Sequence, residues 1–180
     1  MSGNSSYLYK RQWKTNINFS ISIMALFERS GKSLKKGDLI PSFTLKDQNG
    51  NPVDLPEALG ENGGVIYFYP KDDSPVCTRQ ARAFRDHYEA FTDAGVRVIG
   101  INSGSTESHK EFQQKYDLPF TLLSDPDNEV LRQFGIKNVL FLTGRETFII
   151  NAKGRVVHKF RDLVNAGNHI EEALGALKLL

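Results

Sequence analysis

Cysteine is nearly absent from this sequence, because the 180 residues include only Cys77. A single cysteine excludes a disulfide within the chain, and it excludes zinc and iron–sulfur sites built from several cysteines. The four histidines are scattered and form no His-x-x-x-His pair, so we expect no metal site. Gly100 and Gly104 lie in no nucleotide-binding fingerprint. We therefore expect the chain to work without a metal or an organic cofactor.

Long hydrophobic runs are absent too. The sequence contains no stretch of 18 or more apolar residues, so we expect no transmembrane helix and no membrane partner. The net charge is only +2, which gives no electrostatic reason to expect a nucleic-acid partner. A chain of 180 residues with 39% hydrophobic and 24% charged residues is typical of a soluble globular protein with one sizeable domain.

Acidic residues are missing from the beginning of the chain, where none precedes Glu28. Residues 1–36 contain seven Lys or Arg against that one acid, whereas residues 37–180 contain 16 Lys or Arg and 20 acids. We therefore predict a basic, disordered N-terminal extension over 1–36 and a folded domain over 37–180.

The extension allows more than one interpretation. Its basic, serine-rich and acid-poor composition is typical of an organellar transit peptide. Alternatively, translation truly starts at Met24, and the residues before it are not part of the natural protein. The apolar stretch 17–27 resembles a signal-peptide core, but no small-residue cleavage site follows it. We expect a cytoplasmic protein, or an organellar one if residues 1–36 are a transit peptide.

The hydrophobic pattern predicts strands that alternate with helices. After an edge strand at 39–45, a turn at 47–50 and a returning strand at 53–55, it predicts buried strands at 65–69, 96–101 and 120–123, a hairpin over 147–151 and 155–160, and helices at 103–116, 128–134 and 168–179. One more helix begins after Ser74, with Phe84, Tyr88 and Phe91 on one face. This order predicts an α/β fold with a central mixed sheet that is flanked by helices.

Cys77 lies where a thiol would be reactive. A buried strand at 65–69 leads into the turn and helix-start residues 72–75, so Cys77 falls in the first turn of a helix. Unpaired backbone N–H groups and the helix dipole favour an anion there. Arg79 and Arg82 lie close by in sequence, and nearby cations favour the thiolate further. The alternative is a structural cysteine that packs in the helix like a small hydrophobic residue.

The residues around Cys77 carry a family resemblance. Pro70-x-x-x-Ser74-x-x-Cys77 is similar to the peroxiredoxin motif Pro-x-x-x-(Thr/Ser)-x-x-Cys, and the surrounding string YPKDDSPVCT…AFRD resembles the bacterioferritin comigratory protein branch, also called peroxiredoxin Q. The similarity continues through FTLLSD at 120–125, QFG at 133–135 and GRETFIIN at 144–151. It covers residues 37–180 and implies a thioredoxin-like fold.

This resemblance also implies an activity. The chain would be an antioxidant, thioredoxin-dependent peroxidase that reduces hydrogen peroxide or alkyl hydroperoxides through a sulfenic acid on Cys77. Ser74 would turn its hydroxyl towards the substrate, cap the helix, or do both. Pro70 would shape the pocket, and Arg145 would hold the thiolate and the peroxide. Without the resemblance, we would interpret Arg145 as a solvated charge at the end of a strand.

One position departs from the family pattern. Many peroxiredoxin Q sequences carry a resolving cysteine five residues after the reactive one, and here that position is Arg82. The resemblance then implies a one-cysteine mechanism, in which thioredoxin, glutaredoxin or glutathione reduces the oxidised Cys77. We expect such a chain to be a monomer. The alternative is a redox-sensing or chaperone-like thioredoxin-fold protein that forms mixed disulfides with its partners and turns over poorly.

Overall fold

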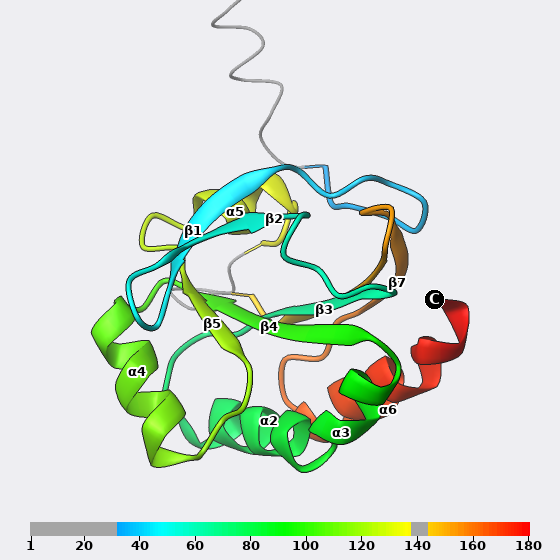
Figure 1. Ribbon diagram of the computed structural model, residues 1–180. Helices are drawn as coiled ribbons and strands as arrows, with labels where there is room; N and C mark the ends of the chain where they lie inside the picture. The colour runs from blue at the N-terminus through cyan, green and yellow to red at the C-terminus, as the bar shows by residue number, and fades with distance from the viewer. Residues whose placement is uncertain (1–31, 138–143) are drawn as a thin grey trace, which may run out of the picture.

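The computed structural model describes residues 32–137 and 144–180 (Figure 1). In chain order its elements are β1 (Phe43–Asp47), β2 (Pro52–Leu55), β3 (Gly63–Phe68), α2 (Pro75–Asp86), α3 (Tyr88–Asp93), β4 (Val96–Asn102), α4 (Thr106–Lys115), β5 (Thr121–Ser124), α5 (Glu129–Gln133), β6 (Glu146–Asn151), β7 (Val156–Phe160), α6 (Ala166–Ala176) and the short 3₁₀ helix η1 (Leu177–Leu179).

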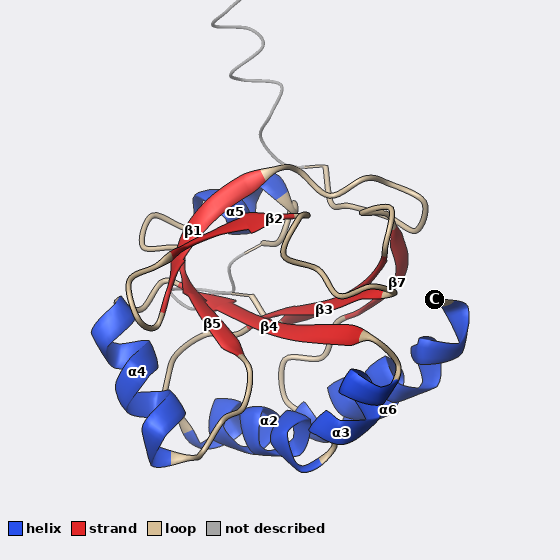
Figure 2. Ribbon diagram, in the orientation of Figure 1, coloured by secondary structure: helices blue, strands red, loops and turns tan. Residues whose placement is uncertain are grey.

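The strands form a mixed sheet. Two hydrogen-bonded groups have the orders β2-β1-β5-β4 and β3-β6-β7, and only the β4–β5 pair within them is parallel. The groups meet where β3 runs beside β4, and just beyond β3 the Tyr69 N–H donates to the Ile101 carbonyl at 3.2 Å. Figure 2 shows helices on the outside of this sheet. The predicted α/β fold, with a mixed sheet flanked by helices, is therefore confirmed.

The sheet separates two hydrophobic clusters, and β3 contributes to both. All six residues of β3 are buried, which is typical of a strand covered on both faces. Because side chains alternate along a strand, Val65 and Tyr67 join the cluster beneath α2 and α6, whereas Ile66 and Phe68 join the opposite cluster. Figure 1 shows α2, α3, α4 and α6 on the first face and the β1–β2 hairpin with α5 on the second. Cys77 belongs to the first cluster.

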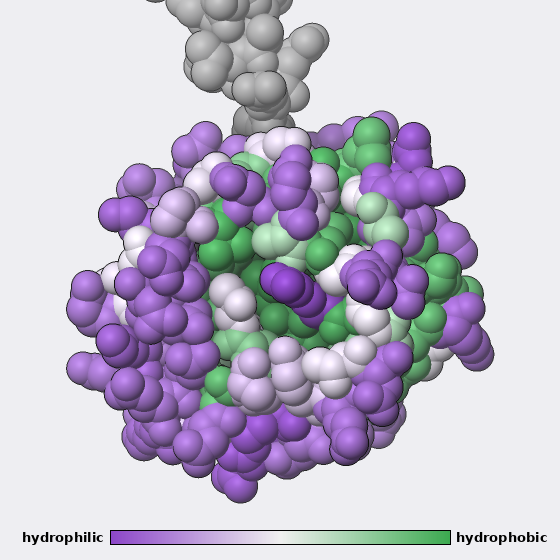
Figure 3. Space-filling model, viewed as in Figure 1, coloured by the Kyte–Doolittle hydropathy of each residue, from purple (hydrophilic) through white to green (hydrophobic). Residues whose placement is uncertain are grey.

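Figure 3 shows the molecule in the orientation of Figure 1, with apolar residues gathered in the middle of the visible surface around one strongly hydrophilic residue and hydrophilic residues along the rim. The partly buried residues Val53, Ala58 and Leu59, from β2 and the turn after it, pack against the second cluster. The β1–β2 hairpin and the turn after it thus cover one face of the sheet, and helices cover the other. Among residues 32–137 and 144–180, no helix has the length and apolar character needed to cross a membrane.

Two sequence expectations are wrong in detail. The apolar spacing of Phe84, Tyr88 and Phe91 suggested one continuous helix, but α2 ends at Asp86 and α3 begins at Tyr88. The reason is His87, whose ring Nδ1 donates to the Ala83 carbonyl at 2.9 Å. In a continuous helix that carbonyl would accept the backbone N–H of His87, which instead bonds to the carbonyl of Arg85.

The second error concerns the first strand. The chain makes only an isolated bridge between Leu39 and Arg155 before Pro41, and β1 begins at Phe43. β1 then lies between β2 and β5, so it is an interior strand and not the predicted edge strand. Pro41 fits this arrangement because it precedes β1 and so lies outside its hydrogen-bonded segment. The apolar run 139–142 lies outside the described residues.

Candidate active site

Cys77 is placed by the junction between β3 and α2. Ser74 occupies the N-cap position with extended backbone angles, and Pro75 follows as the first helical residue, where its missing N–H costs no hydrogen bond. The first intrahelical bond runs from the Thr78 N–H to the Ser74 carbonyl at 2.8 Å. Cys77 is therefore the third residue of α2 and lies in its first turn, as predicted. Its sulfur lies at the end of the helix where the dipole favours negative charge.

Arg145 lies directly against this cysteine. Its Nη2 atom lies 3.2 Å from the Cys77 sulfur, and its Nη1 atom donates to Oε1 of Gln80. All three residues are buried, with exposed fractions of 2% for Cys77 and Arg145 and 0% for Gln80. A guanidinium is always charged, so this site holds a cation at contact distance from a thiol in surroundings that screen charge weakly. The structure thus brings together two of the four predicted site residues.

Ser74 and Pro70 precede the cysteine on the loop side, and neither forms a hydrogen bond with its side chain. The Ser74 side chain makes no capping bond to the helix; its hydroxyl donates to the Lys71 carbonyl at 3.2 Å. Because that bond uses the only hydroxyl proton, both oxygen lone pairs remain available as acceptors. Pro70 is half-buried and follows Tyr69, immediately after β3. Both side chains therefore stand at the entrance to the helix that carries Cys77.

Aromatic rings from β3, from the residue just after it and from α2 pack in one cluster with the cysteine. Tyr67 and Tyr69 are 1% exposed, and the Tyr67 ring stacks on Phe84 of α2 with centroids 4.7 Å apart. Burial raises the pKa of both phenols well above the usual value, and the negative charge of Asp72 acts in the same direction. Both tyrosines therefore stay neutral at physiological pH. These rings keep water away from the side of Cys77 that faces the sheet.

Gln80 is a site residue that the sequence interpretation missed. It lies three residues after Cys77, and side chains at that spacing share one face of a helix. That spacing was the available signal, but glutamine alone suggests no chemistry. In the structure Gln80 fixes one arm of the Arg145 guanidinium. The Gln80 Nε2 atom and the Arg145 Nε atom have no hydrogen-bond partner among the described residues, so the site contains buried donors that are not used.

Arg145 immediately precedes β6, and its guanidinium points to the cysteine. Tyr67 pairs with Thr147 across the β3–β6 ladder, and residues two apart on a strand point to the same face. Arg145, two residues before Thr147, thus lies on the face that carries Cys77. The Thr147 hydroxyl lies 2.8 Å from Nδ1 of His169 in α6, and Nε2 of that ring donates to the Asp162 carbonyl at 2.8 Å. The Arg145 side of the site is therefore braced by α6.

Comparison with known proteins shows the family to which the chain is similar. Residues 36–159 match the AhpC/TSA family. The chain is 48% identical over 147 residues to the chloroplastic peroxiredoxin Q of Sedum lineare, in an alignment that covers 81% of this chain and 78% of the relative. It is 47% identical over 147 residues to the chloroplastic peroxiredoxin Q of Arabidopsis thaliana, in an alignment that covers 81% of this chain and 68% of the relative. The peroxidoxin BcpB of Mycobacterium tuberculosis superimposes with a TM-score of 0.76 at 30% identity over 82% of this chain and 98% of the other.

The chain belongs to the AhpC/TSA family of peroxiredoxins, in the peroxiredoxin Q branch. The thioredoxin-like fold that the resemblance implied is confirmed, and so is the class of activity, a thiol-dependent peroxidase. This peroxiredoxin is a one-cysteine variant, since its sequence contains Cys77 alone.

The position of the family's resolving cysteine is on the outside of this peroxiredoxin. Arg82 is exposed on α2, and so is Arg79, one turn earlier. Neither belongs to the buried cluster around Cys77. Their side chains therefore place positive charge on the outer surface of the helix that carries the nucleophile.

We find no group of three or more His, Cys, Asp or Glu suited to a metal ion within residues 32–137 and 144–180.

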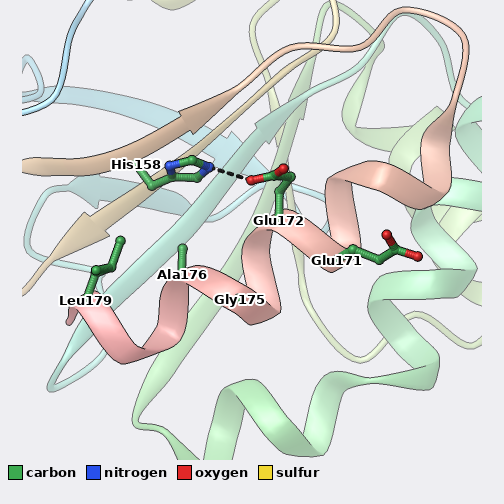
Figure 4. Close-up of a pocket in the computed structure, with 6 residues that line it drawn as sticks. All are labelled: His158, Glu171, Glu172, Gly175, Ala176 and Leu179. Carbon is green, nitrogen blue, oxygen red and sulfur yellow. Dashed lines mark hydrogen bonds and ion pairs between the residues drawn. The ribbon is translucent and has the colours of Figure 1, made fainter.

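A hollow between β7 and α6 lies apart from these contacts. Figure 4 shows its lining, in which His158 Nε2 and Glu172 Oε2 form a pair at 2.8 Å above Gly175 and Ala176. Both partners of the pair are partly exposed, which limits its energetic value. None of these lining residues forms a hydrogen bond or ion pair with Cys77, Gln80 or Arg145. The hollow is therefore separate from the peroxiredoxin site.

Proposed function

We propose that Cys77 is the nucleophile of the peroxidase reaction. The observation that supports this most directly is the 3.2 Å contact between the Arg145 guanidinium and the Cys77 sulfur in a buried site. A cation at this distance favours the thiolate, and the first turn of α2 acts in the same direction. The thiolate is the form of cysteine that attacks an electrophile.

In the first step the thiolate attacks an oxygen of hydrogen peroxide or an alkyl hydroperoxide. A sulfur–oxygen bond forms as the O–O bond breaks, so sulfur is oxidised to the sulfenic acid and the peroxide is reduced. The leaving hydroxide or alkoxide takes up a proton and departs as water or alcohol. Arg145 holds the thiolate and the peroxide. The free lone pairs of the Ser74 hydroxyl accept a hydrogen bond from the O–H of the substrate. Pro70 shapes the pocket and adds no competing N–H donor.

In the second step an external thiol attacks the sulfenic sulfur, and water leaves as a mixed disulfide forms. A second thiol then releases reduced Cys77 and carries away the disulfide. Thioredoxin, glutaredoxin and glutathione are the reductants we consider. Cys77 is only 2% exposed, so the first turn of α2 or the loop before it must move to admit the thiol. Because no second cysteine exists, the oxidised form persists until that thiol arrives.

The substrates follow from the same site. A Xanthomonas campestris bacterioferritin comigratory protein, 32% identical with a TM-score of 0.69 over 76% of this chain and 90% of the other, is described as having alkyl peroxide reduction activity. On that basis we propose that this chain also reduces organic hydroperoxides. The apolar rings of Tyr67 and Phe84 are compatible with an alkyl group. We propose that the chain acts as a monomer, since each chain contains all the site residues.

The decisive experiment compares wild type with Cys77→Ser in a steady-state peroxide assay, with each reductant supplied in turn. We expect sustained turnover by the wild type with at least one reductant, and none by Cys77→Ser. Residual turnover above a few per cent in the variant would contradict the assignment of Cys77. If the wild type consumes a single equivalent of peroxide and then stops with every reductant, the alternative function, a sensor that acts through mixed disulfides, is favoured.

We propose further that residues 1–36 are a targeting extension and that 37–180 are sufficient for catalysis. The basic composition of 1–36 and the chloroplastic names of the relatives support an organellar location over a cytoplasmic one. Residues just before this boundary do contact the domain, since the Leu34 N–H donates to the Phe134 carbonyl at 3.2 Å. Chains that start at Lys32 and at Gly37 should therefore both retain the peroxidase rate, and the shorter one should unfold at a lower temperature. Loss of the rate in the Gly37 chain would contradict the proposal.

A further inference from the structure

The loop between β3 and α2 is fastened by one buried carboxylate. Asp72 Oδ1 accepts from the Tyr69 hydroxyl at 2.7 Å and from Asn102 Nδ2 at 2.9 Å. Its Oδ2 accepts from the Ser108 hydroxyl at 2.6 Å and from His109 Nδ1 at 2.8 Å. Four donors thus converge on a single side chain that lies five residues before Cys77. The mechanism described above uses none of these contacts.

His109 is a cation in this arrangement. Its Nε2 atom lies 3.2 Å from the Leu123 carbonyl, which can only accept, and its Nδ1 atom faces the Asp72 carboxylate. Both ring nitrogens therefore donate, which requires a proton on each. The ring is 0% exposed, so the pair is a buried ion pair. Burial pushes the pKa of Asp72 up, but the hydrogen bond and charge of His109 and the Ser108 bond outweigh it, and the pKa lies below its usual value.

The partners of Asp72 come from separate parts of the fold. Tyr69 follows β3, Asn102 ends β4, Ser108 and His109 belong to α4, and His109 continues the chain of bonds to β5. The next loop residue, Asp73, has a φ of 53°, a left-handed conformation that is uncommon for residues other than glycine, asparagine and aspartate. The bonds that Asp72 accepts from these elements fasten the loop to its surroundings.

We propose that Asp72 and His109 are positioning residues for Cys77. Their buried pair fixes the loop Lys71–Ser74 against α4, and this sets the place at which α2 begins and the Cys77 sulfur meets Arg145. The inference rests on the proposed function, because it assumes that Cys77 is the nucleophile. It assigns a role in the reaction to two residues that do not touch the reacting atoms.

The test variant is Asp72→Asn, and the neighbouring residue provides a matched control. An asparagine at 72 has one oxygen and one NH₂ group, so its NH₂ must face two donors, and the loop loses its anchor. Asp73 also bonds to α4, through Lys115 Nζ at 2.6 Å and the Tyr116 hydroxyl at 2.5 Å, but its side chain is about half exposed. Asparagine tolerates a left-handed φ, so Asp73→Asn removes a surface carboxylate from the same loop without adding strain.

Two readouts separate positioning from other roles. We expect Asp72→Asn to lower the rate of peroxide reduction roughly 10- to 100-fold, as for small displacements of a reacting group. We also expect the pH profile of Cys77 alkylation by iodoacetamide to move to higher pH, because the sulfur loses its contact with Arg145. Simple removal of a nearby negative charge would move that profile to lower pH. A shift to lower pH, or a rate within twofold of Asp73→Asn, would overturn the proposal.

A double variant keeps the inference testable if Asp72→Asn folds poorly. His109→Gln alone leaves the carboxylate buried without its cation, whereas Asp72→Asn/His109→Gln leaves two neutral amides that can bond to each other. We expect the double variant to be faster than the product of the two single effects predicts. Independent effects on the rate would contradict a shared role. If Cys77→Ser remains active, the proposed function fails; if only the Asp72 results differ from expectation, this inference alone fails.

Discussion

The two buried histidines of this protein support opposite sides of the same site, and they do so in different charge states. His109 lies in α4 and holds Asp72, before Cys77, whereas His169 lies in α6 and holds Thr147, after Arg145. Figure 1 shows α4 and α6 at the two ends of the helical layer, with α2 between them. Both rings are 0% exposed. Each histidine therefore supports one member of the Cys77–Arg145 pair.

The two rings share one interaction and differ in the other. In each, Nε2 donates to a backbone carbonyl, of Leu123 in one case and of Asp162 in the other. The Nδ1 of His109 faces a carboxylate and must donate, whereas that of His169 faces the Thr147 hydroxyl and can accept. A neutral ring thus satisfies every partner of His169, while only a charged ring satisfies those of His109.

The electrostatic surroundings explain this difference. Burial lowers the pKa of His169, and the positive charge of Arg145 lowers it further, against the opposing effects of Asp162. A second cation next to Arg145 would be repelled, so the neutral ring fits there. Next to Asp72, a neutral ring would leave a buried carboxylate without its cation. Histidine can therefore support both sides of the site, because the group that faces its Nδ1 atom, Asp72 or Thr147, selects the protonation state of the ring.

The largest difference between the two supports should appear when each ring is removed. His109→Leu leaves the Asp72 carboxylate buried without a cation, and breaking a buried ion pair in this way costs about 3–5 kcal/mol. We expect the free energy of unfolding in urea at pH 7 to fall by that amount. His158→Leu, on β7, is the control, because His158 pairs with Glu172 at the surface and should cost far less. Equal losses for His109→Leu and His158→Leu would refute the ion-pair assignment.

The sequence indicated one half of this arrangement and not the other. Cys77 was predicted from its local setting, a buried strand followed by Pro70 and helix-start residues, and all of this lies within a dozen positions. Arg145 was found only through the family resemblance, because it is 68 residues away in sequence and a lone arginine has no local signature. The fold was predicted from hydrophobic periodicity. That prediction was wrong at His87, where a side chain alters the backbone.

The supporting network could not be read from the sequence for a physical reason. Asp72 and Asp73 were interpreted as turn residues, which they are, and the histidines as scattered. Asp72 pairs with His109 at a separation of 37 residues, and Thr147 with His169 at 22. Contacts of that range depend on how β4, α4 and α6 pack against the sheet, and no periodicity within one segment records them. Only the tertiary structure distinguishes the buried Asp72 from its exposed neighbour.

A smaller loss is expected from the neutral support. His169→Leu removes two hydrogen bonds between neutral groups and leaves the Thr147 hydroxyl and the Asp162 carbonyl unsatisfied, which costs about 1–3 kcal/mol. Urea unfolding at pH 7 measures this, and the loss should be smaller than for His109→Leu. Thr147→Val, which removes only the hydroxyl, should account for part of it. If His169→Leu destabilises the protein more than His109→Leu, the assignment of the charged and neutral rings is reversed.

The smallest effect is a difference in pH dependence. The pKa of His169 is lower in the folded protein than in the unfolded chain, where it is about 6.5, so the unfolded chain binds more protons as the pH falls below 7. Stability is therefore lost as the pH falls through that region. His169→Gln should remove this part of the slope. Asp72 acts in a different window, because its lowered pKa gives stability that is lost only below the ordinary carboxyl range of about pH 4. Urea unfolding at half-unit steps from pH 7 to pH 3 separates the two. A His169→Gln slope identical to that of wild type above pH 5 would show that His169 does not titrate as a buried neutral ring.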